Sequence, residues 1–282
     1  MALKKLEGET MGWQILVHVI LIVGAILMFG PFLPVISASL KSYSELMLRP
    51  FAIIPKKFLW GNYLKVFQEV PFLLYIWNTV KVSFLCTVGV LASSSMAAYA
   101  FARLRFPGRN LLFLIYLATM MVPGQVTLVP VFILMRNFGL IDTHASLILP
   151  MWGLTAAYGT FLLRQFFLTI PRDLEEAAIL DGCGYFGRFT RIILPLSKPA
   201  LATLGIFTLL SMWNNYLYPL VFLNSPEKRT LTLGLAMFRG DVDVQWNLLM
   251  AGTILSICPM VIAFLAAQRY FVEGITLTGL KG

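Results

Sequence analysis

Amide, hydroxyl and aromatic side chains gather near the end of one apolar stretch of this 282-residue chain. The cluster comprises Ser211, Trp213, Asn214, Asn215, Tyr216 and Tyr218. Amides hydrogen-bond to hydroxyl groups and aromatic faces stack on CH-rich rings, so the set suits a polyhydroxylated ring compound. With 3.6 residues per turn, one side of a helix would carry four of its polar members: Ser211, Asn214, Asn215 and Tyr218.

This polar side needs a wet or protein-lined surrounding, because amides and hydroxyls are costly to place against lipid. Pro219 has no N–H to bond the carbonyl of Asn215, so that oxygen is also expected to be available there. Two interpretations remain open. The four residues line a path for a solute, or they pack against a partner membrane subunit.

A second polar stretch lies mid-chain, where seven charged residues and three glycines fall within residues 172–191. Asp173 is expected to cap a helix, and Glu176 three residues later completes a capping-box pattern. Gly182 should end that helix in the left-handed conformation. A second amphipathic helix is expected over about residues 185–194. The pattern therefore predicts a helix, a glycine bend and a second helix, with small alanines that let another protein approach closely.

The composition predicts an integral membrane protein. Hydrophobic residues make up 59% of the chain and charged residues 12%, against about 25% charged in a typical soluble domain. The three cysteines, Cys86, Cys183 and Cys258, are far apart and show no metal-site spacing. The sequence has no Gly-Lys dipeptide and hence no Walker A lysine. If ATP drives a process here, another chain must bind it.

Six apolar segments are long enough to cross a bilayer. They are residues 13–40, 72–102, 110–135, 144–167, 199–223 and 247–270. The predicted fold is therefore all-α and polytopic, one domain over residues 1–282, with the polar loop 168–198 between the fourth and fifth spans. Arg103, Arg105 and Arg109 crowd one tight turn, whereas the next short turn has no basic residue. Short basic loops stay inside, so both termini and the loop 168–198 are expected to be cytoplasmic.

Several of these segments contain proline, and none contains Asp or Glu. The prolines are Pro123, Pro130, Pro150, Pro219 and Pro259. Each breaks a backbone hydrogen bond, which a bundle around a polar path or a tightly packed bundle can accommodate. The lack of intramembrane carboxylates argues against an ion-coupled carrier that works alone. Small residues four apart, Ser94, Ala98 and Ala102, favour a close helix–helix contact.

The mid-chain stretch "EAAILDGCGYFGRFTRIILP" resembles the signature of importer permeases driven by ATP-binding cassettes. Every defined position of that signature is filled, by Glu176, Ala177, Ala178, Gly182, Ile192, Leu194 and Pro195. Further stretches, among them "AAYAFARLRFPGR", "GLIDTHASLILP" and "WNNYLYPL", are similar to the MalG-type permeases of oligosaccharide importers. The glycerol-3-phosphate permeases are close relatives of that group.

This resemblance implies a six-helix subunit of a prokaryotic cell membrane that forms half of a translocation pathway. Its partners would be a MalF-like second permease, two copies of an ATPase and an extracytoplasmic binding protein. The signature residues, with Asp173, would dock in a cleft of the ATPase, which would hold ATP and Mg. This chain would bind no cofactor and would not be an enzyme.

The resemblance favours a sugar as the substrate, with glycerol-3-phosphate or a related polyol phosphate as the alternative. An ion-coupled carrier and a structural subunit without a pathway of its own are the less favoured readings. The first would lose uptake when the membrane potential collapses, and the second is disfavoured by the polar cluster around Asn215.

The loop over residues 224–245 contains "PEKRT" and "RGDVD" and faces outward under this topology. The resemblance implies that such a loop can reach into the cleft of the binding protein. The candidate contact residues are Glu227, Lys228, Arg229, Arg239, Asp241 and Asp243. The alternative is a solvated connector with no such contact.

Overall fold

The computed structural model describes residues 11–154, 156–240 and 243–279, and these form helices joined by turns, without a multi-residue strand. The prediction of an all-α fold is confirmed. The chain divides into two compact units. The first contains Met1–Val70 and Leu235–Ser256, and the second contains Pro71–Gly234 and Ile257–Gly282.

The first unit contains α1 (Met11–Phe29), α2 (Phe32–Ser39), α3 (Tyr43–Leu48), α4 (Gly61–Glu69) and the start of α16 (Trp246–Gly279). The apolar segment predicted as one span over residues 13–40 contains two helices, because α1 ends before Gly30 and Pro31, and α1 alone is long and apolar enough to cross a membrane. Pro31 has no N–H for the carbonyl one turn earlier, so the helix cannot continue regularly through it. The turn after α2 is stabilised by Asn62 of α4, whose amide donates to the carbonyls of Ser39 and Lys41 at 2.8 Å each.

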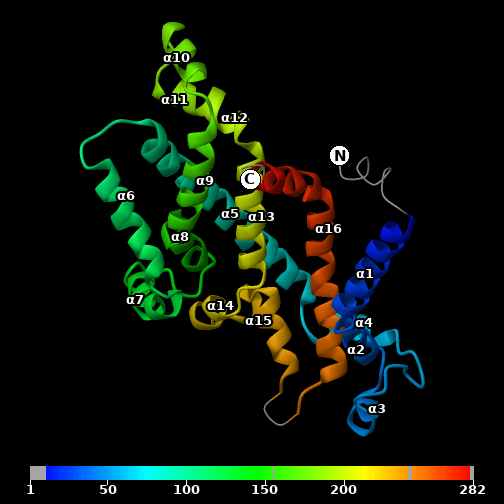
Figure 1. The fold of residues 1–282 in the computed structure, drawn as a ribbon. Helices are drawn as coiled ribbons and strands as arrows, with labels where there is room; N and C mark the ends of the chain where they lie inside the picture. Colours follow the sequence, from blue (N-terminus) through cyan, green and yellow to red (C-terminus); the bar gives the residue numbers. More distant parts are fainter. Residues whose placement is uncertain (1–10, 155, 241–242, 280–282) are drawn as a thin grey trace. The chain divides into compact units, whose positions relative to one another are not determined.

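The second unit is built around α5 (Phe72–Arg103), a helix of 32 residues. Its neighbours are α8 (Ala145–Leu154), α9 (Ala156–Thr169) and α13 (Lys198–Trp213), as Figure 1 shows. The three small residues of α5, Ser94, Ala98 and Ala102, are all buried. The Ser94 hydroxyl donates to the carbonyl of Ala156 at 3.2 Å, and a methyl group at Gly159 would lie 2.4 Å from that hydroxyl. The predicted close contact is confirmed.

Three segments of the second unit, which include α8, α9 and α13, are bent pairs of helices. The pair α6 (Arg109–Ala118) with the turn Thr119–Met121, followed by α7 (Gly124–Asn137), bends by 98°. Pro123 explains this bend, because it holds the preceding Val122 in an extended conformation. The pair α8 and α9 bends by 44°, and Tyr185–Leu196 meets α13 at 78°.

Membrane spans can be counted from length and composition. Met11–Phe29, Phe72–Arg103 and Trp246–Leu265 each qualify alone, and up to six spans result if every bent pair counts as one. The polytopic prediction is confirmed, while the number six stays a prediction. The fifth predicted span, residues 199–223, is not one helix: α13 ends at Trp213 and α14 covers Leu217–Phe222.

Candidate functional site

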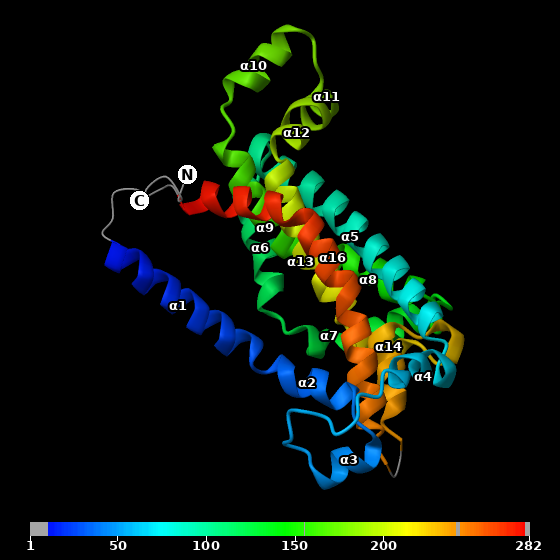
Figure 2. The same cartoon turned by 90° about the vertical axis from the view of Figure 1, so that its right-hand side faces the viewer.

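The polar stretch in the middle of the chain folds as a helix, a glycine bend and a second helix (Figures 1 and 2). The first helix, α10, covers Asp173–Leu180. Gly182 follows it with φ of 77°, and its N–H donates to the carbonyl of Ile179 at 2.9 Å. The next N–H, from Cys183, reaches Ala178 at 2.8 Å. These two bonds form a Schellman motif, so the predicted role of Gly182 in ending the helix is confirmed.

The predicted capping box at the start of α10 is wrong. Arg172 occupies the cap position, and no side chain accepts a hydrogen bond from the first turn there. Asp173 is instead the first residue of the helix. Its carboxylate and those of Glu175 and Glu176 lie in the first turn, where the helix dipole favours negative charge.

The second helix is less regular than predicted. It runs through α11 (Tyr185–Arg188), a π-helical turn over Phe189–Ile193 and α12 (Leu194–Leu196). Phe189 and Ile193 are buried, while Ile192 and Leu194 are half-buried and Pro195 is exposed. The extra residue in the π turn rotates the helix face. As a result the signature residues after Gly182 stay closer to the surface than their two buried neighbours.

The loop turns large apolar side chains outward. Leu180 is 89% exposed and Phe186 is 76% exposed. The large apolar side chains exposed on the loop are Leu174, Ile179, Leu180, Tyr185 and Phe186. Glu176 and Ala177 are also exposed, and Ala178 is half-buried. Exposed apolar side chains gathered on one short segment mark a candidate surface for contact with a protein or a membrane.

One acidic side chain of α10 points inward instead. Glu175 is 6% exposed, and its Oε1 lies 3.1 Å from Nε of Arg103, the last residue of α5. Nε makes no hydrogen bond among the described residues, so this contact is electrostatic. The Arg103 guanidinium also donates to the carbonyls of Phe167 and Ile170 at the end of α9, the latter at 2.6 Å. The pair therefore joins α5, α9 and α10.

Sequence reasoning missed this pair. Removing one partner of a buried ion pair leaves an uncompensated charge, at a cost of about 3–5 kcal/mol. No local signal marked Glu175 for burial, because adjacent residues about 100° apart can both face solvent, as Glu176 and Ala177 do. Its partner lies 72 residues earlier in the sequence.

A cavity of about 880 Å³ lies in the second unit, lined by residues of α6 to α9, α13 and α14. Its polar lining comprises Tyr116, Thr119, Thr127, Tyr158, Thr208, Ser211, Asn215 and Tyr218. Three of the four residues predicted to line a path, Ser211, Asn215 and Tyr218, therefore share one cavity. Asn214 does not line it, and its amide donates to the carbonyl of Leu210 at 3.0 Å.

The arrangement differs from the predicted continuous helix face. The chain leaves helical geometry between α13 and α14, at residues 214–216. The cause is Pro219, which cannot donate to Asn215. The freed carbonyl of Asn215 accepts a hydrogen bond from the Thr232 hydroxyl at 2.7 Å. The Asn215 side chain in turn accepts from the Tyr218 N–H at 3.3 Å, so the two residues fix each other across the break.

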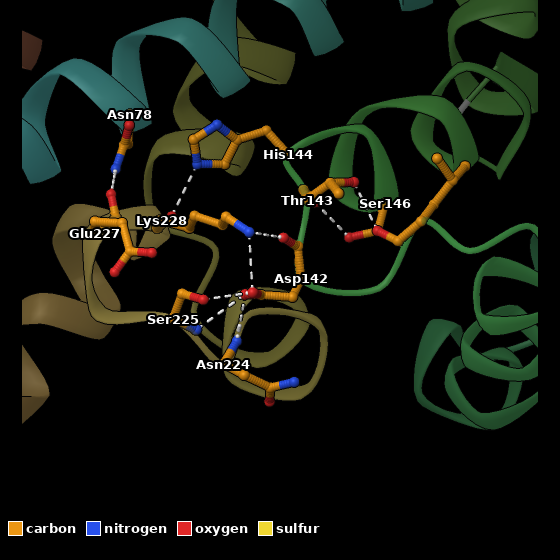
Figure 3. A network of polar contacts seen from close by, with 10 residues as sticks. Asn78, Asp142, Thr143, His144, Ser146, Asn224, Ser225, Glu227 and Lys228 are labelled. Atoms are coloured by element: carbon orange, nitrogen blue, oxygen red, sulfur yellow. Dashed lines mark hydrogen bonds and ion pairs between the residues drawn. The ribbon is translucent and has the colours of Figure 1, made fainter.

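Part of the predicted outer loop is held by a polar network (Figure 3). The Asp142 carboxylate accepts from the N–H groups of Asn224 and Ser225, 2.9 Å each, and from the Ser225 hydroxyl. Lys228 lies 3.0 Å from the same carboxylate. The hydrogen bonds from Ser225, followed by that from Lys228, hold the pKa of Asp142 well below its usual range. This network was not predicted from the sequence.

The six candidate contact residues of the outer loop therefore differ in their surroundings. Lys228 and Arg229 are half-buried, contrary to the exposure predicted for them, and Lys228 is paired with Asp142. Glu227, Arg239 and Asp243 are exposed, and Asp243 accepts a hydrogen bond from Tyr43. Asp241 lies outside the described residues. Within the described part of the chain, no group of three or more His, Cys, Asp or Glu could hold a metal ion.

Comparison with known proteins extends over most of the chain. Residues 89–276 match the family described as "Binding-protein-dependent transport system inner membrane component". The chain is 38% identical over 256 residues to the arabinooligosaccharides transport system permease protein AraQ of Halalkalibacterium halodurans, covering 89% of this chain and 91% of that one. It is 36% identical over 273 residues to the sn-glycerol-3-phosphate transport system permease protein UgpE of Yersinia pestis, covering 94% and 96%.

A solved structure shows the same fold. It belongs to a bacterial ABC transporter involved in the import of the acidic polysaccharide alginate. The TM-score is 0.77 at 26% sequence identity, and the match covers 92% of this chain and 96% of the other.

Proposed function

This chain belongs to the family of inner-membrane components of binding-protein-dependent transport systems, and we propose that it forms half of the pathway through which an ATP-driven importer moves an oligosaccharide. The observation that carries the proposal is the exposed surface of the helix–Gly–helix loop, where apolar and charged side chains are mixed. Leu180 is 89% exposed and Phe186 is 76% exposed, and the carboxylates of Asp173, Glu176 and Asp181 are exposed on the same loop, which suits contact with another protein better than contact with lipid.

The covering partner in this proposal is a separate ATPase, which holds ATP and Mg. Glu176, Ala177 and Ala178 lie on α10, between the exposed apolar side chains of Leu174 and Leu180 in sequence. Two small side chains let a partner surface approach the helix backbone closely, and an exposed carboxylate offers a partner for a basic residue. Displacement of the ATPase would then move the loop, and no nucleotide need bind this chain.

The proposed pathway includes the cavity between α6 and α14. Its lining is mainly apolar and includes three tyrosines, one amide and several hydroxyls, and these groups suit the CH faces and hydroxyls of a sugar. A MalF-like second permease would supply the other half of the pathway. An extracytoplasmic binding protein would deliver the sugar to the exposed part of the loop 224–245.

A glycerol-3-phosphate or related polyol-phosphate importer is the alternative, supported by the similarity to the Yersinia permease. The substrates can be separated by uptake assays with the complete transporter in proteoliposomes. We expect oligosaccharides to be taken up and glycerol-3-phosphate to be neither taken up nor competitive. Uptake should require ATP inside and the binding protein outside, and should persist when the membrane potential is collapsed. Uptake that follows the potential and ignores ATP would contradict the whole proposal.

The proposed topology places both termini and α10 in the cytoplasm. After removal of the native cysteines, a cysteine at Asp173 should react with impermeant thiol reagents only from the cytoplasmic side. A cysteine at Glu227 should react only from outside, and docked binding protein should slow its reaction. The reverse pattern would contradict the orientation. Labelling at Glu227 that the binding protein leaves unchanged would support a solvated connector instead.

A further inference from the structure

Two side chains one turn apart at the end of α5 hold both halves of the helix–Gly–helix loop. Arg103 pairs with the buried Glu175 of α10. Tyr99 lies 3.5 Å from the second oxygen of the same carboxylate, and its ring packs on Phe189 of the second helix at 5.2 Å between centroids. Tyr99, Phe189 and Ile193 belong to one buried apolar cluster. The loop therefore has a non-covalent attachment to α5 in addition to its covalent links to α9 and α13.

Helix α5 is continuous and is therefore expected to move as a rigid body. α5 has no proline and no break over its 32 residues, whereas the neighbouring segments are bent pairs. Trp152 of α8 packs directly on Gly89, where an added methyl group would lie 1.8 Å from the indole, and it donates to the carbonyl of Leu85 at 3.1 Å. Ser94 is held against α9. These contacts hold α5, α8 and α9 together, so that a displacement of α5 carries its two neighbours with it.

The opposite end of α5 holds the outer loop. The Asn78 amide donates to the carbonyls of Glu227 and Arg229 at 2.9 and 3.0 Å, as Figure 3 shows for the first of them. The Thr79 hydroxyl accepts from the N–H of Leu231 at 2.7 Å. From Asn78 to Arg103, a helix rising 1.5 Å per residue extends over about 38 Å, enough to cross a bilayer core of about 30 Å.

We propose that α5 transmits the ATP-driven displacement of the helix–Gly–helix loop to the outer loop at residues 227–231, and that Arg103 is the positioning residue that makes the helix–Gly–helix loop and α5 move together. This inference rests on the proposed function, because it requires an ATPase docked at the loop. The side chains of Asn78 and Thr79 form hydrogen bonds with the backbone of the outer loop rather than with its side chains. A shift of α5 would therefore move the whole segment.

The test uses the assembled transporter, with both permeases, the ATPase and the binding protein, in lipid nanodiscs. A reporter cysteine replaces Glu227 in a chain without native cysteines, and its labelling rate from outside is measured with and without bound ATP. We expect the rate to depend on ATP in the parent and not in Arg103→Gln. Binding-protein-stimulated ATP hydrolysis should fall by between about 5-fold and 150-fold, the usual range of allosteric coupling. The ATPase should still co-purify, because the outward face of α10 is unchanged.

Matched variants separate coupling from general damage. Arg103→Lys keeps a charge beside Glu175 and should recover part of the ATP dependence. Arg105→Gln removes an exposed arginine two residues away and should match the parent. If Arg103→Gln fails to assemble, Glu175→Gln tests the same pair from outside the membrane helices.

An ATP-dependent labelling rate that survives in both Arg103→Gln and Glu175→Gln would overturn the inference. So would a labelling rate that ignores ATP in the parent. If no ATPase co-purifies with the parent, the proposed function itself fails, and that result is distinct from both.

Discussion

Replacing Gly182 by valine is expected to lower ATP-driven uptake by about tenfold or more while the chain still inserts in the membrane. Gly182 has φ of 77°, where a residue with a Cβ atom is strained by about 1–2 kcal/mol and a β-branched one by more. The strain falls on the bend that sets the direction of the second helix relative to α10. A change of 1.4 kcal/mol corresponds to about tenfold in an equilibrium constant, so docking should weaken by at least about that factor.

Gly184 supplies the matched control. Its φ is −71°, and a methyl group added there would meet nothing within 4 Å. Gly184→Ala should therefore keep normal activity. Co-purification of the ATPase and binding-protein-stimulated ATP hydrolysis measure the effect. Normal values of both in Gly182→Val would contradict the docking assignment.

Glu176→Lys changes the same surface without straining the backbone. The Glu176 carboxylate is exposed in the first turn of α10, where a lysine would oppose the helix dipole and repel a basic residue of a partner. We expect the same loss in the two assays, with unchanged insertion. Loss for Gly182→Val alone would assign the role to the bend rather than to the acidic face.

The features of the loop that could be predicted from sequence are local ones. A glycine that follows a run of helix formers ends the helix for a reason contained in three or four residues, and Gly182 does so. The long apolar segments are equally local, because about 20 apolar residues in a row have few other fates. The capping box failed because a start one residue earlier placed Asp173 inside the helix and Arg172 at the cap.

The features that could not be predicted depend on partners distant in sequence. Arg103 looked like one more basic residue of a cytoplasmic turn, yet its side chain is 4% exposed and faces Glu175. Lys228 looked like a free charge of an outer loop, yet Asp142 holds it. Nothing in a single sequence tells which acid and which base meet, because that depends on how the helices between them pack.

The break near Asn215 lies between these two cases. Pro219 predicted that the Asn215 carbonyl would lose its bond within the helix, and this carbonyl indeed accepts from the Thr232 hydroxyl instead. Whether a helix kinks and continues or stops depends on what accepts or donates in place of the lost bond. Here Thr232, 17 residues later, supplies that donor, so the helix stops at Trp213 and resumes at Leu217.

The break separates residues that a continuous helix would have placed on one side: Asn215 and Tyr218 line the cavity and Asn214 does not. Tyr218→Leu and Asn215→Leu are expected to lower the rate of sugar uptake or change sugar preference, because both residues line the cavity of about 880 Å³. Asn214→Leu should have no such effect, because Asn214 lies beside them in sequence but outside the lining. Loss of one hydrogen bond to the sugar, about 0.5–1.5 kcal/mol, corresponds to a fall of roughly 2-fold to 12-fold in uptake.

A structural effect must be separated from a loss of sugar contact. Asn215 also accepts from the Tyr218 N–H, so its replacement can disturb the break itself. Tyr218→Phe removes only the hydroxyl, which lies 3.4 Å from the Gly124 carbonyl, and keeps the ring in place. Uptake is measured on assembled complexes with a series of neutral sugars. If the assembled variants at Asn215 and Tyr218 transport every sugar at the parent rate, the pathway assignment is wrong. If the variants at Asn215 and Tyr218 fail to assemble while Asn214→Leu assembles normally, Asn215 and Tyr218 instead pack against the second permease.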